Sequence, residues 1–145
     1  MRWTAGSTAL LALATACSRP APTTGAVVAL PPAADLLGEM ATAALIADAR
    51  LEAADSLYTQ DAEIIAEGRR RMEPPRFAGI EAGGQVIVGS TRVDLSGNFG
   101  WALVEYRWLA ADQNLLREGR ATLVFVRAAG TGAWRITHAH SSLVH

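Results

Sequence analysis

The chain has 145 residues, half of them hydrophobic, and a formal net charge of −1 at pH 7. This length and composition predict one folded domain, and the near balance of charges argues against nucleic acid as a partner. All 13 basic residues are arginine, which excludes a mechanism that uses a lysine Schiff base or a lysine general base.

The N-terminus has the pattern of an export signal. Arg2 supplies a positive charge, residues 9–14 form a short apolar run, and two small residues at 15–16 precede Cys17. The apolar run is too short to span a bilayer. Cys17 is the only cysteine, so no disulfide is expected within the chain.

The position of Cys17 resembles the lipobox of a bacterial lipoprotein, in which the cysteine is lipidated and becomes the mature N-terminus. Ala14 departs from this pattern, which prefers leucine there. We interpret residues 1–17 as a lipoprotein-type signal peptide, with an ordinary signal peptide cleaved near Ala16 as the alternative. Ser18 stands in place of aspartate after the cysteine. Under the bacterial sorting rule this implies anchoring at the periplasmic face of the outer membrane, with membrane contact through the lipid alone.

Residues 18–32 are rich in proline, alanine and threonine and are expected to form an extended tether. Residues 33–145 are expected to form the folded domain. Apolar residues recur every three or four positions between Asp35 and Tyr58, which predicts helical structure. Because aspartate is a favourable N-cap residue, Asp48 suggests two consecutive helices, at about 34–47 and 49–58.

Strand patterns follow the predicted helices. Residues 63–67 are a strand candidate, whereas Pro74 and Pro75 place residues 69–77 in a loop or an edge hairpin. Further strands are predicted at 85–95, 100–110, 117–127 and 134–142, separated by turn-forming residues at 96–98, 111–114 and 129–132. Helices followed by an antiparallel meander predict an α+β domain with the helices on one face of the sheet.

The last predicted strand changes from apolar to polar residues along its length. Successive side chains of a strand point to opposite faces. Strict alternation assigns one face to Trp134, Ile136, His138, His140 and Ser142. A strand of this kind leads from a packed core to the polar end of a pocket, so the sequence predicts a site there without identifying its ligand.

The order of elements and several segments resemble the NTF2-like superfamily and, more narrowly, its SnoaL-like branch. The segments are residues 54–65, 101–106, 119–126 and 134–142. The resemblance implies a cone with a cavity at one end, in which a curved antiparallel sheet of about four to six strands wraps around two N-terminal helices. Homodimers are common in this family. Its third helix would follow residues 79–80, but two glycines within 81–85 predict that this helix is short or missing.

Two residues are candidates for catalysis. We expect His140 to act as a general base near neutral pH and Tyr106 to polarise a carbonyl. If Ala102 and Val104 face the helices, Tyr106 continues the same face into the cavity. The alternative for each candidate is a structural role in the core.

Ligand contacts are expected from Trp108, Arg120, Thr122, His138 and Ser142. Trp108 suits an apolar ligand with a few polar groups, and Arg120 suits a carboxylate. Core packing and a solvated strand end are the respective alternatives. A His-x-His pair supplies two ligands where catalytic zinc usually has three, and only Glu105 or Glu67 is available as a third. The sequence therefore predicts no metal and no other cofactor.

Three functions are compatible with these patterns. The leading interpretation is an exported domain that binds a small apolar or carboxylated molecule without transforming it. The second is an isomerase or dehydratase in which His140 is the base. The third is an interaction module that dimerises through outward-facing Trp101, Leu103 and Leu109, since a contiguous exposed apolar patch marks an interface. The first and third interpretations can hold together, and a homodimer is expected.

Overall fold

The computed structural model describes residues 32–145. The predicted signal peptide, Cys17 and the tether up to residue 31 lie outside the described residues. In chain order the elements are α1 (Pro32–Ala49), a single 3-10 turn η1 (Asp55–Leu57), β1 (Tyr58–Ala66), β2 (Arg69–Arg70), β3 (Gln85–Ser96), β4 (Phe99–Leu109), β5 (Leu116–Arg127) and β6 (Trp134–Leu143). Within residues 32–145, no helix is both long and apolar enough to cross a lipid bilayer.

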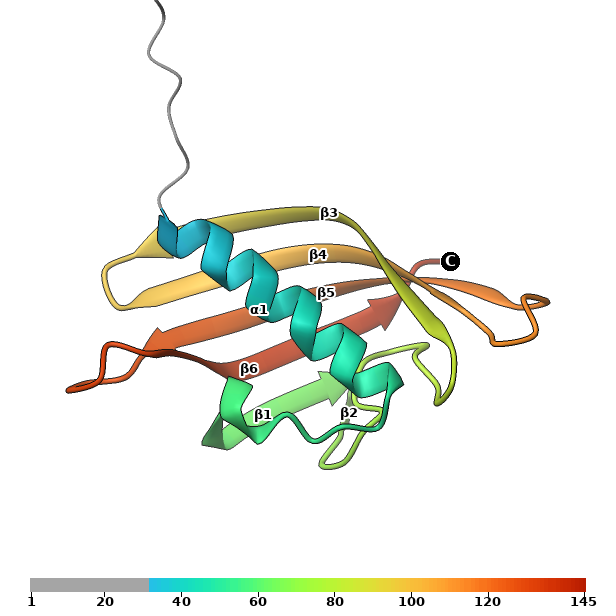
Figure 1. The fold of residues 1–145 in the computed structure, drawn as a ribbon, viewed down its shortest axis with the longest axis horizontal. Coiled ribbons are helices and arrows are strands. Elements are labelled where there is room, and N and C mark those ends of the chain that lie inside the picture. Colours follow the sequence, from blue (N-terminus) through green and yellow to red (C-terminus); the bar gives the residue numbers. More distant parts are fainter. Residues whose placement is uncertain (1–31) are drawn as a thin grey trace, which may run out of the picture.

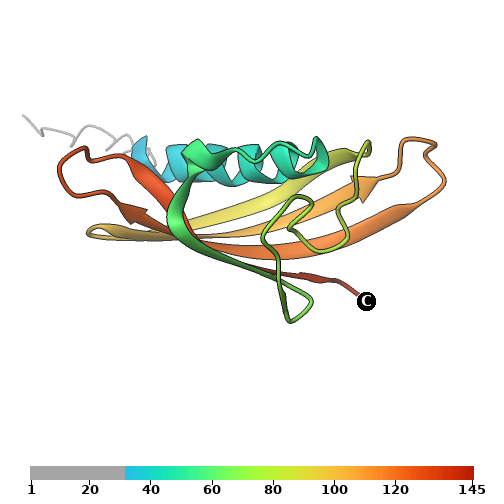
Figure 2. The same ribbon diagram turned by 90° about the horizontal axis from the view of Figure 1, so that it is seen from below.

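The six strands form one sheet in the order β2-β1-β6-β5-β4-β3. Neighbouring strands are antiparallel except for β1 and β6, which run parallel. Figure 1 and Figure 2 show that the sheet is curved and that α1 lies across its concave face. No helix of the described region covers the convex face (Figure 2).

The bounds of β3, β4, β5 and β6 were predicted correctly to within one residue, and the loop that contains Pro74 and Pro75 was also predicted. The first strand was predicted at 63–67, whereas β1 already begins at Tyr58. Residues 81–84 contain no helix, as the two glycines in this stretch predict. The faces of β4 are also as predicted. Ala102, Val104, Tyr106 and Trp108 are buried on the concave side, and the residues between them are more exposed.

The prediction of two N-terminal helices is wrong. One helix ends at Ala49, and η1 is all that remains of the second. The chain leaves the helix through Leu51 and Ala54, both of which have a positive φ, a conformation that an α-helix does not contain. Asp48 is not an N-cap. Its side chain is fully buried and is used for contacts with a distant segment.

The predicted face assignment in the last strand is also wrong. Phe125 of β5 pairs with Ile136, but the preceding Val124 pairs with His138, so Thr137 is an extra residue in β6. Such a β-bulge shifts the alternation of side chains by one position. Trp134 and Ile136 are buried on the concave side, as are Ala139 and Ser141 after the bulge. His138, His140 and Ser142 therefore belong to the convex face.

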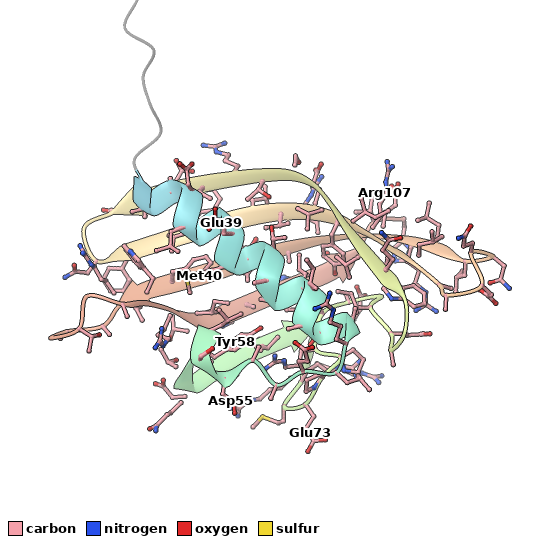
Figure 3. The ribbon with its side chains drawn as sticks, viewed as in Figure 1. Glu39, Met40, Asp55, Tyr58, Glu73 and Arg107 are labelled. Atoms are coloured by element: carbon pink, nitrogen blue, oxygen red, sulfur yellow. The ribbon has the colours of Figure 1, made fainter. Side chains whose placement is uncertain are left out.

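The core lies between α1 and the concave face. Its fully buried side chains come from α1, β4, β5 and β6 and include Leu37, Leu45, Val104, Leu123, Phe125 and Ile136. Phe77 and Ile80, from the loop between β2 and β3, complete it. This loop therefore packs into the core on the concave side of the sheet. Figure 3 shows the side chains in the same view, with Glu39 on α1 and Arg107 on β4 labelled.

Candidate functional site

The predicted site residues are divided between the two faces of the sheet. Tyr106 and Trp108 are buried on the concave face, with 2% and 3% of their surface exposed. His140 is an exposed residue on the convex face. A general base must reach within hydrogen-bond distance of its substrate. His140 and Tyr106 point to opposite sides of the sheet, so they do not form the expected pair.

The other polar candidates gather on the convex face. Three cross-strand pairs join β5 to β6 there: Val124 with His138, Thr122 with His140, and Arg120 with Ser142. Paired residues of adjacent strands project to the same side. Arg120, Thr122, His138, His140 and Ser142 therefore project from the same face of the sheet. That face is the convex one, because the bulge at Thr137 turns the β6 residues outward.

Four ion pairs cross the convex face. The distances are 2.7 Å for Arg120–Glu105, 2.9 Å for Arg107–Glu118, 3.2 Å for Arg92–Asp94 and 4.0 Å for Arg70–Glu63. A hydrogen bond from Ser90 and the Arg120 guanidinium hold the pKa of Glu105 below its usual range. Arg120, the candidate carboxylate ligand, is thus already bound to a carboxylate of its own chain.

Apolar side chains lie between these charged residues. Trp101 and Phe99 project from β4 with 37% and 62% of their surface exposed. Leu103 is half-buried, as are Val124 and Val126 of the adjacent strand. At one end of the same face is a pocket of about 340 Å³, lined by residues that include Ile87, Glu105, Arg107, Glu118, Arg120 and Val144. We call this face of the sheet the convex surface. Its residues are Glu63, Arg70, Ile87, Ser90, Arg92, Asp94, Phe99, Trp101, Leu103, Glu105, Arg107, Glu118, Arg120, Thr122, Val124, Val126, His138, His140, Ser142 and Val144.

A second polar cluster, on the concave side, was not predicted. The Asp48 carboxylate accepts hydrogen bonds from the backbone N–H groups of Arg76 and Phe77, at 2.5 and 2.8 Å. The Ser141 hydroxyl accepts one from the N–H of Ala78 at 2.9 Å, and the Tyr106 hydroxyl donates to the Ala78 carbonyl at 2.6 Å. All of these residues are buried. We call Asp48, Tyr106 and Ser141 the concave triad.

Burial changes the pKa values of Asp48 and Tyr106 in the concave triad. Burial raises the pKa of Asp48, and the N–H groups of Phe77 and Arg76 together with the Arg76 charge oppose that shift. Burial likewise raises the pKa of Tyr106. The Arg76 guanidinium also lies 4.3 Å from the ring centre of Tyr58, the residue labelled at the start of β1 in Figure 3. Burial raises the pKa of Tyr58 to about 12. Both tyrosines are therefore neutral at physiological pH.

Trp108 has a structural role in the same region. Its indole N–H donates to the Glu81 carbonyl at 3.0 Å, and the Arg117 guanidinium lies 5.2 Å from its ring centre. Arg117 also bonds the Gly79 carbonyl and the Glu81 carboxylate. The contacts of Trp108 are thus those of core packing, which was the alternative to ligand binding for this residue.

The sequence held a signal for only part of this cluster. Asp48 lies four residues after Ala44 on the buried side of a helix rich in small apolar residues, where a charged side chain needs a partner. Its partner Arg76 is 28 residues away in a loop, and no spacing rule connects them. Ser141 was assigned to the wrong face by strict alternation. Within residues 32–145, no group of three or more His, Cys, Asp or Glu side chains is placed to hold a metal ion.

Several solved structures share this fold. An NTF2-like protein from Streptomyces avermitilis, provisionally described as a dehydratase, has 18% sequence identity and a TM-score of 0.60, covering 78% of this chain and 96% of that chain. A Parabacteroides distasonis protein, provisionally described as a ketosteroid isomerase, has 14% identity and a TM-score of 0.58, covering 77% and 87%. An NTF2-like superfamily protein from Salmonella enterica has 16% identity and a TM-score of 0.59, covering 77% and 91%.

At these identities the likeness concerns the fold alone. No curated protein sequence matches the chain. Residues 35–145 match the model of a protein family described as the SnoaL-like domain. This match covers most of the chain and includes every strand described above. The chain therefore belongs to the SnoaL-like family and has the NTF2-like fold.

Proposed function

We propose that this SnoaL-like domain is a non-catalytic interaction module that forms a homodimer through its convex surface. The observation that carries the proposal is the apolar character of a sheet face that no described helix covers. Antiparallel sheets with one face in water usually present polar residues there. Here Phe99, Trp101, Leu103, Val124 and Val126 form an adjoining apolar group, at the end of that face where β4 begins.

The charges of the convex surface support a second copy of the chain as the partner. A two-fold interface brings the same patch of both subunits together, so the patch must be complementary to itself. Each of its four acidic residues, Glu63, Asp94, Glu105 and Glu118, is paired with an arginine. A surface whose ion pairs balance each other, beside exposed aromatic side chains, meets a copy of itself with little net repulsion.

The enzymatic alternative lacks a convergent set of groups. The two solved relatives described as a dehydratase and as a ketosteroid isomerase share only the fold with this chain. His140 is exposed, and the one acid within 4.0 Å of a histidine in the described region is Glu63, which lies 3.9 Å from His138 rather than from His140. A general base without an orienting partner, on the opposite face from Tyr106, does not form an active site.

Binding of a small ligand, our leading interpretation of the sequence, is favoured by one specific observation, the concave triad. Its polar atoms converge inside the cone, but residues 76–81 occupy the space in front of them. Ligand binding there requires this segment to move.

Export and lipid anchoring at Cys17 are part of the proposal. They rest on the sequence around Cys17, which resembles a lipobox. A domain tethered at the periplasmic face of the outer membrane would be free to pair with a second copy. Intact-mass analysis of the membrane fraction tests this point. We expect an acylated N-terminus beginning at Cys17 and its loss in Cys17→Ala, whereas an unmodified N-terminus at Cys17 or elsewhere would overturn the anchoring.

The dimer is tested by sedimentation velocity on the full-length chain at micromolar concentration. We expect the wild type to sediment as a dimer and Trp101→Glu as a monomer. Leu36→Glu is the matched control, because Leu36 is an exposed apolar residue (44%) on α1, away from the convex surface. It should remain dimeric. A monomeric wild type, or a dimer that survives Trp101→Glu, would overturn the proposal.

A further inference from the structure

The loop between β2 and β3 is held in an unusual way. Arg71 donates a backbone hydrogen bond to Ile64 and Gly83 donates one to Ala49, so both ends of the loop are fixed. Within the described region, residues 72–82 between these ends make no backbone–backbone hydrogen bond outside the loop. We call residues 72–82 the strap. Its main chain is bound instead by side chains of α1, β4, β5 and β6.

The concave triad binds the main chain of the strap through side-chain hydrogen bonds, as a receptor binds the backbone of a peptide ligand. Asp48 accepts two consecutive N–H groups, Ser141 accepts the next one, and Tyr106 donates to the carbonyl of that same residue. The three side chains come from three separate elements and bond the main chain of residues 76–78. Buried polar groups are costly when they are unpaired, so their convergence on one short stretch defines a recognition site for main chain in a turn, since the Ile80 N–H donates to the Phe77 carbonyl at 3.3 Å.

Two side chains of the strap add specificity to this site. The Arg76 guanidinium lies between the Asp48 carboxylate, with Nε at 3.4 Å, and the face of the Tyr58 ring. Phe77 is 2% exposed and belongs to the core cluster. The site therefore has a place for a cation, a place for an aromatic ring and a set of bonds for the amide that follows.

We propose that the concave site is a peptide-recognition site occupied by the chain's own residues 76–80, and that opening of the strap admits a peptide in which a basic residue precedes an aromatic one. This inference goes beyond the proposed dimer and does not depend on it. Such a ligand would place its basic group between Asp48 and Tyr58 and its aromatic ring in the position of Phe77. Its next amide would bond Ser141 and Tyr106.

The closed strap lowers the apparent affinity for any such ligand. A site that is open in only a small fraction of molecules binds with a dissociation constant increased by the inverse of that fraction. Weakening the strap should therefore strengthen binding. Phe77→Ala does this most directly, because it removes the side chain that holds the strap in the core and leaves space for the ring of the ligand.

Fluorescence polarisation with a labelled peptide tests the inference on the full-length chain. The probe is acetyl-Arg-Phe-Ala-Gly-Ile-amide, which has the sequence of residues 76–80. We expect Phe77→Ala to bind it at least about ten-fold more tightly than the wild type. A control peptide with alanine in place of phenylalanine should lose this gain, and so should the double variant Phe77→Ala/Ser141→Ala. Equal binding of both peptides, or no binding by a folded Phe77→Ala, would overturn the proposal.

A measurement on the wild type keeps the inference testable if Phe77→Ala does not fold. Hydrogen exchange reports the free energy of opening at each amide. If the strap opens by itself, the amides of Arg76, Phe77 and Ala78 should exchange at least about ten-fold faster than those of Val104 and Leu123 in the sheet. Equal protection at all these positions would mean that the strap opens only when the whole domain unfolds, and would overturn the proposal.

Discussion

The carboxylate of Asp48 on α1 and the guanidinium of Arg76 in the strap form an ion pair that is almost completely removed from water. Their side chains are 0% and 7% exposed, and the other ion pairs of the described region involve much more exposed groups. This contact joins the helix layer to the loop between β2 and β3. Loss of this ion pair should therefore lower the stability of the whole domain.

Asp48→Ala should destabilise the domain by about 3–5 kcal/mol, because it leaves the buried Arg76 charge and two N–H groups without their acceptor. Urea unfolding followed by circular dichroism measures this loss. Glu39→Ala is the control, since Glu39 is an exposed acid on the same helix (Figure 3). It should change the free energy of unfolding by less than about 0.5 kcal/mol. Similar effects of the two substitutions would show that the ion pair is not important for folding.

Titration of Asp48 should contribute to the change of the free energy of unfolding with pH. Burial raises its pKa in the folded state, so the folded state holds this proton more tightly than the unfolded state does. The stabilising contribution is present below the unfolded pKa and is lost as pH rises through the folded pKa. The free energy of unfolding of the wild type, relative to that of Asp48→Asn, should therefore fall as the pH rises above 3.8, the ordinary pKa of aspartate. A relative rise over this range would mean that the Arg76 charge outweighs burial.

Tyr106 and Tyr58 provide a matched pair of buried hydroxyl groups. Tyr106→Phe removes the 2.6 Å hydrogen bond to the Ala78 carbonyl and should cost about 1–2 kcal/mol. The Tyr58 hydroxyl is buried and has no hydrogen-bond partner within the described residues, so Tyr58→Phe should be neutral or slightly stabilising. Thermal unfolding of both variants compares them directly. Equal destabilisation would mean that the strap gains nothing from the Tyr106 hydroxyl.

Deletion of Thr137 should leave the two faces of β6 unchanged. Thr137 is the extra residue of the bulge, so without it regular alternation still points Ala139 and Ser141 to the concave side and His138 and His140 to the convex side. Deletion of Ala139, which follows the bulge, should instead turn His140 toward the core, and burying this imidazole without a partner should cost more than about 3 kcal/mol. Urea unfolding of the two variants compares them directly. Equal stability of the two variants would contradict the role of the bulge in setting the two faces.

Much of the fold was predictable because its signals are local. The turn residues Ser96-Gly97-Asn98 mark the β3–β4 hairpin, and the alternation in β4 correctly placed Tyr106 and Trp108 on the concave face. The glycines at 83 and 84 correctly predicted that no third helix forms. The second predicted helix failed because its apolar spacing continues through Leu51 and Ala54, where the backbone reverses at positive φ.

The candidate site was less predictable because it depends on pairing between distant residues. The sequence named Arg120, Thr122, His138, His140 and Ser142 as separate candidates, and the structure places all five on the convex face. The sequence could not assign the face of the β6 residues, because a bulge arises from the register between β5 and β6 rather than from any residue of β6. Nor could it join Asp48 to Arg76, since only the packed tertiary structure brings a helix and a loop 28 residues apart to the same buried place.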